Sequence, residues 1–562
     1  MRRVSTTFLL LFFSSTVLAG NTGKLAGRVI DSATKEPLIG ANVVVVGTTL
    51  GASADLDGKY AILNVPPGIH TLRASAVGYG PREVQNVRVS IDLTTEINFE
   101  LGEVAVQAEA VIVTAERPLV QKDLTANTAV INTEDLRALP VTEFSQVLSL
   151  QAGFVAGSLR GGRQGEVAYW IDGVPVTDVY DGSQVVEVNK NLIEEVQLVS
   201  GAFNAEYGQA MSGIVNIATK EGGRQFTGGI GVYGGDYVSK HTDIFAGVDR
   251  VKPTAIRNAE FNLGGPLIGE DLAFSINGRY IYFDGWLNGI RRFNPSNIAF
   301  TDSTGKFNIS RDPSGKGNGS IVPMNWSERK YGQGKLTWRI ASLLKLNYNF
   351  IYDDNTAKAY SRDYFLNPDG IGKNFARSTT QIAQLTHTLS QNTFYTLGAS
   401  LFDKDVKYYL YEDPHDPSYV HPKLLTRDDP FSFLTGGTDL NRFHRSTKTM
   451  LAKLDLSTQI DNQNLVKIGV EARQHKVFLE SFTLQPIQQQ SDINLSKDNP
   501  FIKTEIPDIS SNNHNVYEHK PLELSAYIQD KMEFKDIILN LGIRFDYFKP
   551  DGVVLVDESD PS

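Results

Sequence analysis

The second half of the sequence carries a pattern that few folds can accommodate, in which apolar and polar residues alternate strictly. From Leu344 to Phe350, leucine, tyrosine and phenylalanine take every second position, with lysine or asparagine between them. Similar alternation recurs over 274–282, 466–473 and 539–547. Successive side chains of a strand point to opposite faces, and a strand of about 9–11 residues with one apolar face suits a membrane-spanning barrel with a polar lumen. Residues 223–562 are therefore predicted to form an antiparallel transmembrane β-barrel, in a chain that is mainly β.

The connections between these segments alternate in length, as they do in outer-membrane barrels. Short connections are expected at 266–270, 341–344, 391–392, 461–464 and 535–536. Long polar loops are expected over 285–330, 355–378, 404–446 and 476–519. This spacing predicts roughly ten or eleven strands. A plugged barrel has about 22 strands, and the chain ends at Ser562 inside an apparent loop, so we expect it to be a fragment that holds about half of the barrel.

The N-terminus has the features of a secretory signal peptide over residues 1–19. Two arginines follow Met1, the apolar run FLLLFF spans 8–13, and VLA at 17–19 is a small-residue cleavage site. No later run approaches 18 apolar residues. The chain has no cysteine and a formal net charge of -10, which excludes disulfides, cysteine metal ligands and cysteine nucleophiles and disfavours a nucleic-acid partner.

Residues 20–101 contain short strand candidates separated by glycine and proline turns, which predicts a small β-sandwich. The run DLDG at 55–58 favours a hairpin turn over a calcium loop, because the twelfth position of such a loop is Pro66. The segments GRVIDSATKEPLIGANVVV and DLDGKYAILNVPPGIHTLRASAVGY resemble the carboxypeptidase regulatory-like domain, a transthyretin-like sandwich. That resemblance implies no peptidase activity.

Residues 118–222 are predicted to form an α+β domain, with Thr133 and Thr142 as caps of two short helices. The run SGAFNAEYGQAMSGIVNIATK at 200–220 is rich in glycine and alanine, which indicates turns and close backbone approach. The domain resembles the plug of TonB-dependent outer-membrane receptors, and the resemblance implies that it folds inside the barrel lumen. The residues that carry the plug motif are Asp172, Gly173, Tyr207, Gly208, Gly213 and Asn216.

Residues 102–117 are predicted to be a linker that contains a candidate TonB box, the segment that a periplasmic energy-coupling protein binds. The candidate is EAVIVTA, made of Glu109, Ala110, Val111, Ile112, Val113, Thr114 and Ala115. Its β-branched residues suit the addition of a strand to a partner's sheet edge. A first plug strand, a last strand of the preceding domain and an ordinary linker are the alternatives.

Two arginines of the plug, Arg160 and Arg163, are candidate ligand-facing residues, since a guanidinium binds carboxylate or phosphate. The alternative is a structural pair with an inward barrel carboxylate. The histidines form no recognisable catalytic or metal-binding pattern, and the group around His415 favours a solvated loop. We therefore expect no enzyme activity, no metal and no cofactor.

The resemblance to TonB-dependent receptors implies an outer-membrane importer of a scarce solute, with its N-terminal domain in the periplasm. The implied partners are a TonB-type periplasmic energy-coupling protein, outer-membrane lipid and a small solute or peptide that the sequence does not identify. A surface lipoprotein is a further candidate partner. The alternative is a structural or secretion-linked surface protein that handles peptides or proteins.

Overall fold

A computed structural model describes most of the chain. The described residues are 22–103, 111–114, 125–184, 186–201, 203–301, 303–304, 307–310, 317–425, 427, 432–487, 500–534 and 537–553. The signal peptide expected at 1–19 and the chain end at Ser562 lie outside them.

The largest element is one antiparallel sheet in which neighbours in sequence are neighbours in space. Eleven strands follow one another across it, as the sequence predicted. They are β17 (Thr227–Gly235), β18 (Ile256–Ile268), β19 (Leu272–Phe283), β24 (Ser327–Ala341), β25 (Leu344–Ala357), β26 (Lys373–Ser390), β27 (Thr393–Tyr409), β28 (Asn441–Gln459), β29 (Asn464–Thr483), β33 (Leu522–Glu533) and β34 (Ile538–Lys549). A twelfth, β32 (His514–His519), pairs with β29 beyond the end of β33.

The two faces of this sheet differ as the alternation predicted. In β25, Tyr348 and Phe350 are exposed, whereas Asn347 and Asn349 between them are buried. A soluble protein has the opposite arrangement, so the apolar face is the one that suits lipid. Long connections lie at one end of the sheet and contain short elements. These are β20 (Asn288–Ile290), β21 (Ile298–Thr301), β22 (Phe307–Ser310), β23 (Ile321–Pro323), η2 (Pro368–Gly370), η3 (Pro422–Leu424), β30 (Gln485–Pro486) and β31 (Thr504–Glu505).

The N-terminal domain is a β-sandwich, as predicted. One sheet contains β4 (Lys59–Val65), β1 (Gly23–Asp31), β7 (Thr94–Glu96) and β8 (Phe99–Leu101). The other has the order β3 (Gly51–Ser53), β2 (Asn42–Val45), β5 (Gly68–Ser75), β6 (Arg82–Val89) and β9 (Val111–Thr114). The alternating apolar residues of both sheets, among them Leu25, Val43 and Leu72, form its core. The run at 55–58 is a tight turn, in which the Asp55 carboxylate accepts bonds from the backbone nitrogens of Asp57 and Lys59. It is not the predicted hairpin, because it connects β3 in one sheet to β4 in the other.

The plug is built on a five-stranded sheet of order β10 (Asn127–Asn132), β15 (Ile193–Ser200), β16 (Gly213–Thr219), β13 (Val167–Ile171) and β14 (Val174–Pro175). The remaining elements are α1 (Thr133–Ala138), α2 (Phe144–Ser149), η1 (Lys190–Leu192) and the hairpin β11 (Phe154–Val155) with β12 (Ser158–Leu159). The predicted caps are each one residue off. Asn132 caps α1 and Glu143 precedes α2, while the Thr133 hydroxyl donates to the Ile193 carbonyl instead.

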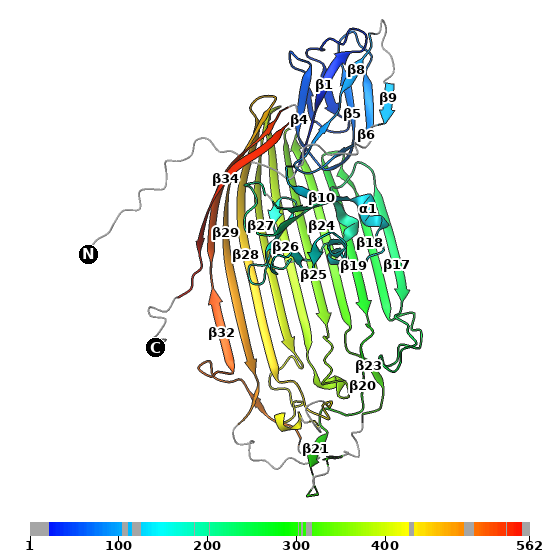
Figure 1. The fold of residues 1–562 in the computed structure, drawn as a ribbon, viewed down its shortest axis with the longest axis vertical. Helices are drawn as coiled ribbons and strands as arrows, with labels where there is room; N and C mark the ends of the chain where they lie inside the picture. Colours follow the sequence, from blue (N-terminus) through cyan, green and yellow to red (C-terminus); the bar gives the residue numbers. More distant parts are fainter. Residues whose placement is uncertain are drawn as a thin grey trace, which may run out of the picture.

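Figure 1 shows the plug against one face of the curved barrel sheet and the sandwich domain at one end of that sheet. The plug core includes Tyr331, Ile351, Ile382 and Leu451 from the barrel. The sandwich lies at the end with short turns, since it contacts Ser342 and Asn462 there. In the described part of the chain, no helix is both long and apolar enough to cross a membrane.

Candidate functional site

The turn at Asp172 and Gly173 makes a heavily bonded contact between plug and barrel. Both residues have positive φ, +48° and +77°, which is the backbone of a type I′ hairpin turn. The Asp172 carboxylate accepts bonds from the backbone nitrogen and hydroxyl of Thr219, at 2.8 and 2.6 Å. From the barrel wall, Lys335 Nζ and Asn349 Nδ2 reach the same carboxylate at 3.1 and 3.0 Å. A buried charge needs such partners, so this turn fixes the plug to the wall.

A second buried ion-pair group lies around Asp178, which is fully removed from solvent. Lys404 Nζ and Arg445 Nη2 of the barrel lie 3.1 and 3.3 Å from its Oδ2. Arg445 also approaches Asp181 at 2.9 Å, and its guanidinium carbon lies 4.3 Å from the centre of the Tyr180 ring. Two cations from neighbouring strands thus bind one plug loop.

The glycine-rich stretch contains the other motif residues, and each makes a tight contact. The Tyr207 ring packs edge-on against Trp170 with centroids 5.0 Å apart, and Asn216 Nδ2 lies 3.3 Å from the Tyr207 hydroxyl. A Cβ on Gly208 would lie 2.5 Å from the Arg544 guanidinium. A Cβ on Gly213 would overlap Leu159. The small residues therefore let the plug approach its own hairpin and the barrel wall closely.

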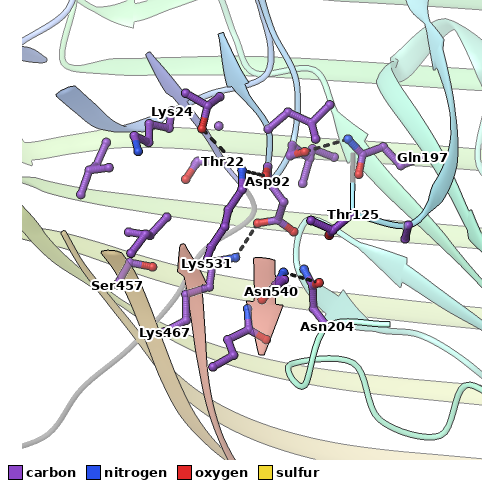
Figure 2. Close-up of a pocket in the computed structure, with 18 of the residues that line it drawn as sticks. Thr22, Lys24, Asp92, Thr125, Gln197, Asn204, Ser457, Lys467, Lys531 and Asn540 are labelled. Atoms are coloured by element: carbon purple, nitrogen blue, oxygen red, sulfur yellow. Dashed lines mark hydrogen bonds and ion pairs between the residues drawn. The ribbon is translucent and has the colours of Figure 1, made fainter. Parts of the chain in front are cut away.

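The sandwich, plug and barrel meet around a cavity of about 80 Å³ (Figure 2). Asp92 from the sandwich lies at its centre. Its carboxylate is 2.5 Å from Lys467 Nζ of the barrel and accepts a bond of 3.0 Å from the Tyr207 hydroxyl of the plug. Lys467 is also 3.1 Å from Glu206 of the plug. One lysine thus joins carboxylates from two different domains.

Comparison with known proteins places the two N-terminal domains. The family model of the CarboxypepD_reg-like domain matches residues 25–113, and that of the TonB-dependent Receptor Plug Domain matches residues 120–215. A TonB-dependent transporter, Oar of Myxococcus xanthus, is 23% identical over 240 residues, which are 39% of this chain and 22% of Oar. The TonB-dependent receptor SusC of Bacteroides thetaiotaomicron is 26% identical over 221 residues, 34% of this chain and 21% of SusC.

The barrel has counterparts among solved structures. The outer-membrane transporter YddB of Escherichia coli has a TM-score of 0.51 at 12% identity, covering 76% of this chain and 58% of YddB. FpvA of P. aeruginosa, solved with bound pyoverdines, has a TM-score of 0.50 at 12% identity, covering 76% of this chain and 52% of FpvA. The chain thus matches about a fifth of the length of the curated relatives and little more than half of these structures.

The order of domains and their fold point to one family. The architecture is that of a TonB-dependent outer-membrane receptor.

The candidate TonB box of this receptor is the outermost strand of the sandwich domain. Val111 to Thr114 form β9, which pairs in parallel with Arg82 to Gln85 of β6. Ile112 is 60% exposed, so β9 is an accessible edge strand. The sandwich therefore extends past the expected boundary at residue 101, and the arrangement matches the last-strand alternative. Glu109, Ala110 and Ala115 lie outside the described residues.

The two candidate ligand-facing arginines of the receptor are exposed. Arg160 has φ +51° and precedes Gly161 in a tight turn, and the Arg163 nitrogen donates to Glu166 Oε2 at 3.0 Å. Within the described residues, neither side chain forms an ion pair, so no barrel carboxylate there supports the structural alternative. Both remain candidates for anion binding.

Sequence reasoning missed the barrel cations that lie opposite the plug carboxylates, which are Lys335, Lys404, Arg445 and Lys467. All four face the plug from strands whose alternation defines an inner face, which is the one signal that points to them. Among their plug partners, Asp172 belongs to the predicted plug motif, whereas Asp178 and Glu206 carry no comparable signal. Burial raises the pKa of Glu195, whose carboxylate accepts the Ile91 backbone N–H at 3.0 Å where the plug meets the sandwich. Across the described ranges, no group of three histidine or acidic side chains is arranged to hold a metal ion.

Proposed function

We propose that the intact receptor imports a scarce solute across the outer membrane by energy-coupled movement of its plug. The observation that carries this proposal is the plug itself, which lies against the polar face of the barrel and is held there by buried ion pairs such as Asp172 with Lys335. The apolar outer face of the sheet contacts outer-membrane lipid in this proposal.

The partner that supplies energy is a TonB-type periplasmic protein, and the sandwich domain lies in the periplasm. Residues 111–114 form an exposed edge strand of β-branched residues, the backbone arrangement that binds a further strand. The transported ligand is a small solute or peptide. Arg160 and Arg163 favour a ligand that carries a carboxylate or phosphate. The receptor acts by transport and not as an enzyme.

The coupling role of the candidate TonB box is tested by Val113→Pro in the intact receptor. Proline removes the backbone donor and is poorly tolerated in a paired strand. We expect the purified periplasmic domain of the host's TonB-type protein to bind this variant at least about tenfold more weakly, because roughly one hydrogen bond of the strand ladder is lost. Val113→Ala retains the donor and is the matched control, expected to bind as the wild type does.

A secretion-linked or structural role is separated from import by energy dependence. We expect Val113→Pro cells to keep normal surface abundance of the receptor. In a panel that supplies iron chelates, oligosaccharides or peptides as the sole source of a nutrient, we expect these cells to lose growth on one of the three classes of compound. Equal growth of Val113→Pro and wild-type cells on every source that needs the receptor would contradict coupling through this segment.

A further inference from the structure

The turn that joins β6 to β7 reaches from the sandwich into the space between plug and barrel. This docking turn comprises residues 90–93, of which 91–93 line the cavity in Figure 2. Asp92 occupies its tip with φ +55°, a left-handed backbone that aspartate tolerates better than most residues. Ile91 beside it is fully buried. A loop with a buried tip and a left-handed residue is shaped for a contact and is not a free surface loop.

The plug satisfies the backbone of the docking turn. The Ile91 N–H donates to Glu195 Oε1 at 3.0 Å, and its carbonyl accepts from Gln197 Nε2 at 2.8 Å. Gln197 also donates to Glu195 at 2.9 Å, so the two side chains form one unit on β15. These bonds replace water for both polar groups of a buried residue.

Asp92 then connects the turn to a plug residue and a barrel residue at the same time. Its two carboxylate oxygens are shared between Lys467 of β29, at 2.5 Å, and Tyr207 of the plug, at 3.0 Å. The side chains of Asp92 and Lys467 are 16% and 10% exposed. Removal of one partner from a pair this buried leaves an uncompensated charge, so the contact resists partial opening.

Further contacts bind the sandwich to the short-turn end of the barrel alone. Glu533 accepts from Lys24 Nζ at 2.5 Å and from the Thr94 hydroxyl at 2.6 Å. Leu63 packs against Phe394 and Leu465. Together with Asp92, these contacts hold the sandwich over the plug at the end from which a periplasmic partner approaches in the importer proposal.

The candidate TonB box is joined to the same docking turn through a single strand. Residues 111–114 pair with the first half of β6, and the docking turn follows directly after β6 ends at Val89. An extended strand is nearly inextensible along its length. Force applied to β9 therefore reaches Asp92 along β6.

We propose that Asp92 fastens the sandwich domain to plug and barrel together, and that the sandwich undocks as a step of energy coupling before the plug moves. The undocking step rests on the proposed import function, whereas the fastening role of Asp92 does not. Asp92 acts as a positioning residue, since it contacts Tyr207 and Lys467 and no solute.

The test uses an introduced thiol as a reporter of docking, because residues 1–562 contain no cysteine that would compete with it. The receptor without the introduced cysteine gives the background labelling. Ile91→Cys is placed in the intact receptor, and its rate of labelling by N-ethylmaleimide is measured in cells with and without a protonophore. Leu63→Cys, at the apolar contact with the barrel, is a second reporter. Resistance of the barrel to unfolding in SDS before heating shows that each variant is folded.

In de-energised cells we expect Asp92→Lys to raise labelling of both reporters at least about tenfold. The substitution places a third cation beside Lys467 and Lys531, whose Nζ lies 3.4 Å from the Asp92 carbonyl. Asp57→Lys, in an exposed turn of the same domain, should leave both rates unchanged. When the reporter cysteine is the only substitution, it should be labelled faster in energised cells than in cells treated with protonophore. Adding Val113→Pro should abolish that difference.

Each outcome decides one part of the proposal. Unchanged labelling in folded Asp92→Lys overturns the fastening role. Faster labelling in Asp92→Lys without any energy dependence overturns undocking as a coupling step. Binding of the TonB-type domain is measured separately and tests the import proposal. A failure of the import proposal can therefore be told apart from a failure of the fastening role or of the undocking step.

Discussion

Lys335 Nζ lies 3.1 Å from Asp172 Oδ2, and these side chains from barrel wall and plug are only 5% and 11% exposed. The carboxylate is aimed at the wall by a hairpin turn that few residues other than aspartate and asparagine can adopt at φ +48°. The left-handed backbone of the turn and the ion pair with Lys335 thus both favour aspartate at position 172.

We expect Asp172→Asn to loosen the plug strongly. Asparagine keeps the turn but removes the carboxylate charge opposite Lys335, which then keeps only the neutral Thr219 carbonyl and hydroxyl as bonded partners at this turn. Removal of one partner of a buried ion pair costs up to about 3–5 kcal/mol. Hydrogen exchange of β13 and β16 amides in the purified receptor should accelerate. Asp403→Asn is the matched control, because Asp403 pairs with Lys448 at 2.7 Å on an exposed surface and should cost no more than about 1 kcal/mol.

Gly213→Ala should destabilise the plug by overpacking. The added Cβ would overlap Leu159 in a strand that is buried throughout, and forced insertion of a methyl group costs about 1–3 kcal/mol. Gly223→Ala, where the nearest atom would lie 3.7 Å away, is the control. Equal thermal unfolding of the plug in the two variants would show that β16 relaxes freely.

Leu541→Arg should harm membrane assembly more than Asn540→Arg. Leu541 is 60% exposed on the apolar face, whereas Asn540 Nδ2 donates to Asn204 of the plug at 2.6 Å. An arginine on the lipid face costs about 2–4 kcal/mol near the bilayer centre and much less in a polar lumen. The fraction of SDS-resistant folded barrel measures the difference, and the assigned faces fail if both variants lose it equally.

Asp31 makes the stability of the sandwich depend on pH at the acid end. Its carboxylate accepts bonds from the Thr34 backbone, the Tyr79 hydroxyl and the Ala33 backbone, at 2.9, 2.8 and 2.6 Å, and these bonds lower its pKa. A group whose pKa falls on folding stabilises above its unfolded pKa, about 4 for aspartate, and this contribution is lost as the pH drops through the folded pKa. Asp31→Asn should therefore weaken the sandwich at pH 7 and flatten its pH dependence below about 4.

Hydrogen exchange of the β1 amides across that pH range checks the expectation. Asp57→Asn, in an exposed turn, should retain the wild-type pH dependence. An unchanged profile in Asp31→Asn would assign the acid sensitivity to other carboxylates.

Local pattern was sufficient wherever a residue's role depends on near neighbours. The alternation from Leu344 to Phe350 determined which face of β25 is apolar, because side chains of a strand alternate whatever surrounds it. The pair Asp172 and Gly173 determined a hairpin for the same reason. Helix starts were less certain, since Asn132 and Thr133 are both good caps and only the tertiary bond from Thr133 to Ile193 decides between them.

The sequence by itself determined the three domains in order, the strand pattern and the plug motif, since each follows from periodicity and turn chemistry along the chain. Only the tertiary structure decided which charges meet. Asp92 and Lys467 are 375 residues apart, and no local rule pairs them. The attachment of β9 to β6 was decided in the same way, because a short β-branched strand can pair with any open edge and the fold alone determines which edge is near.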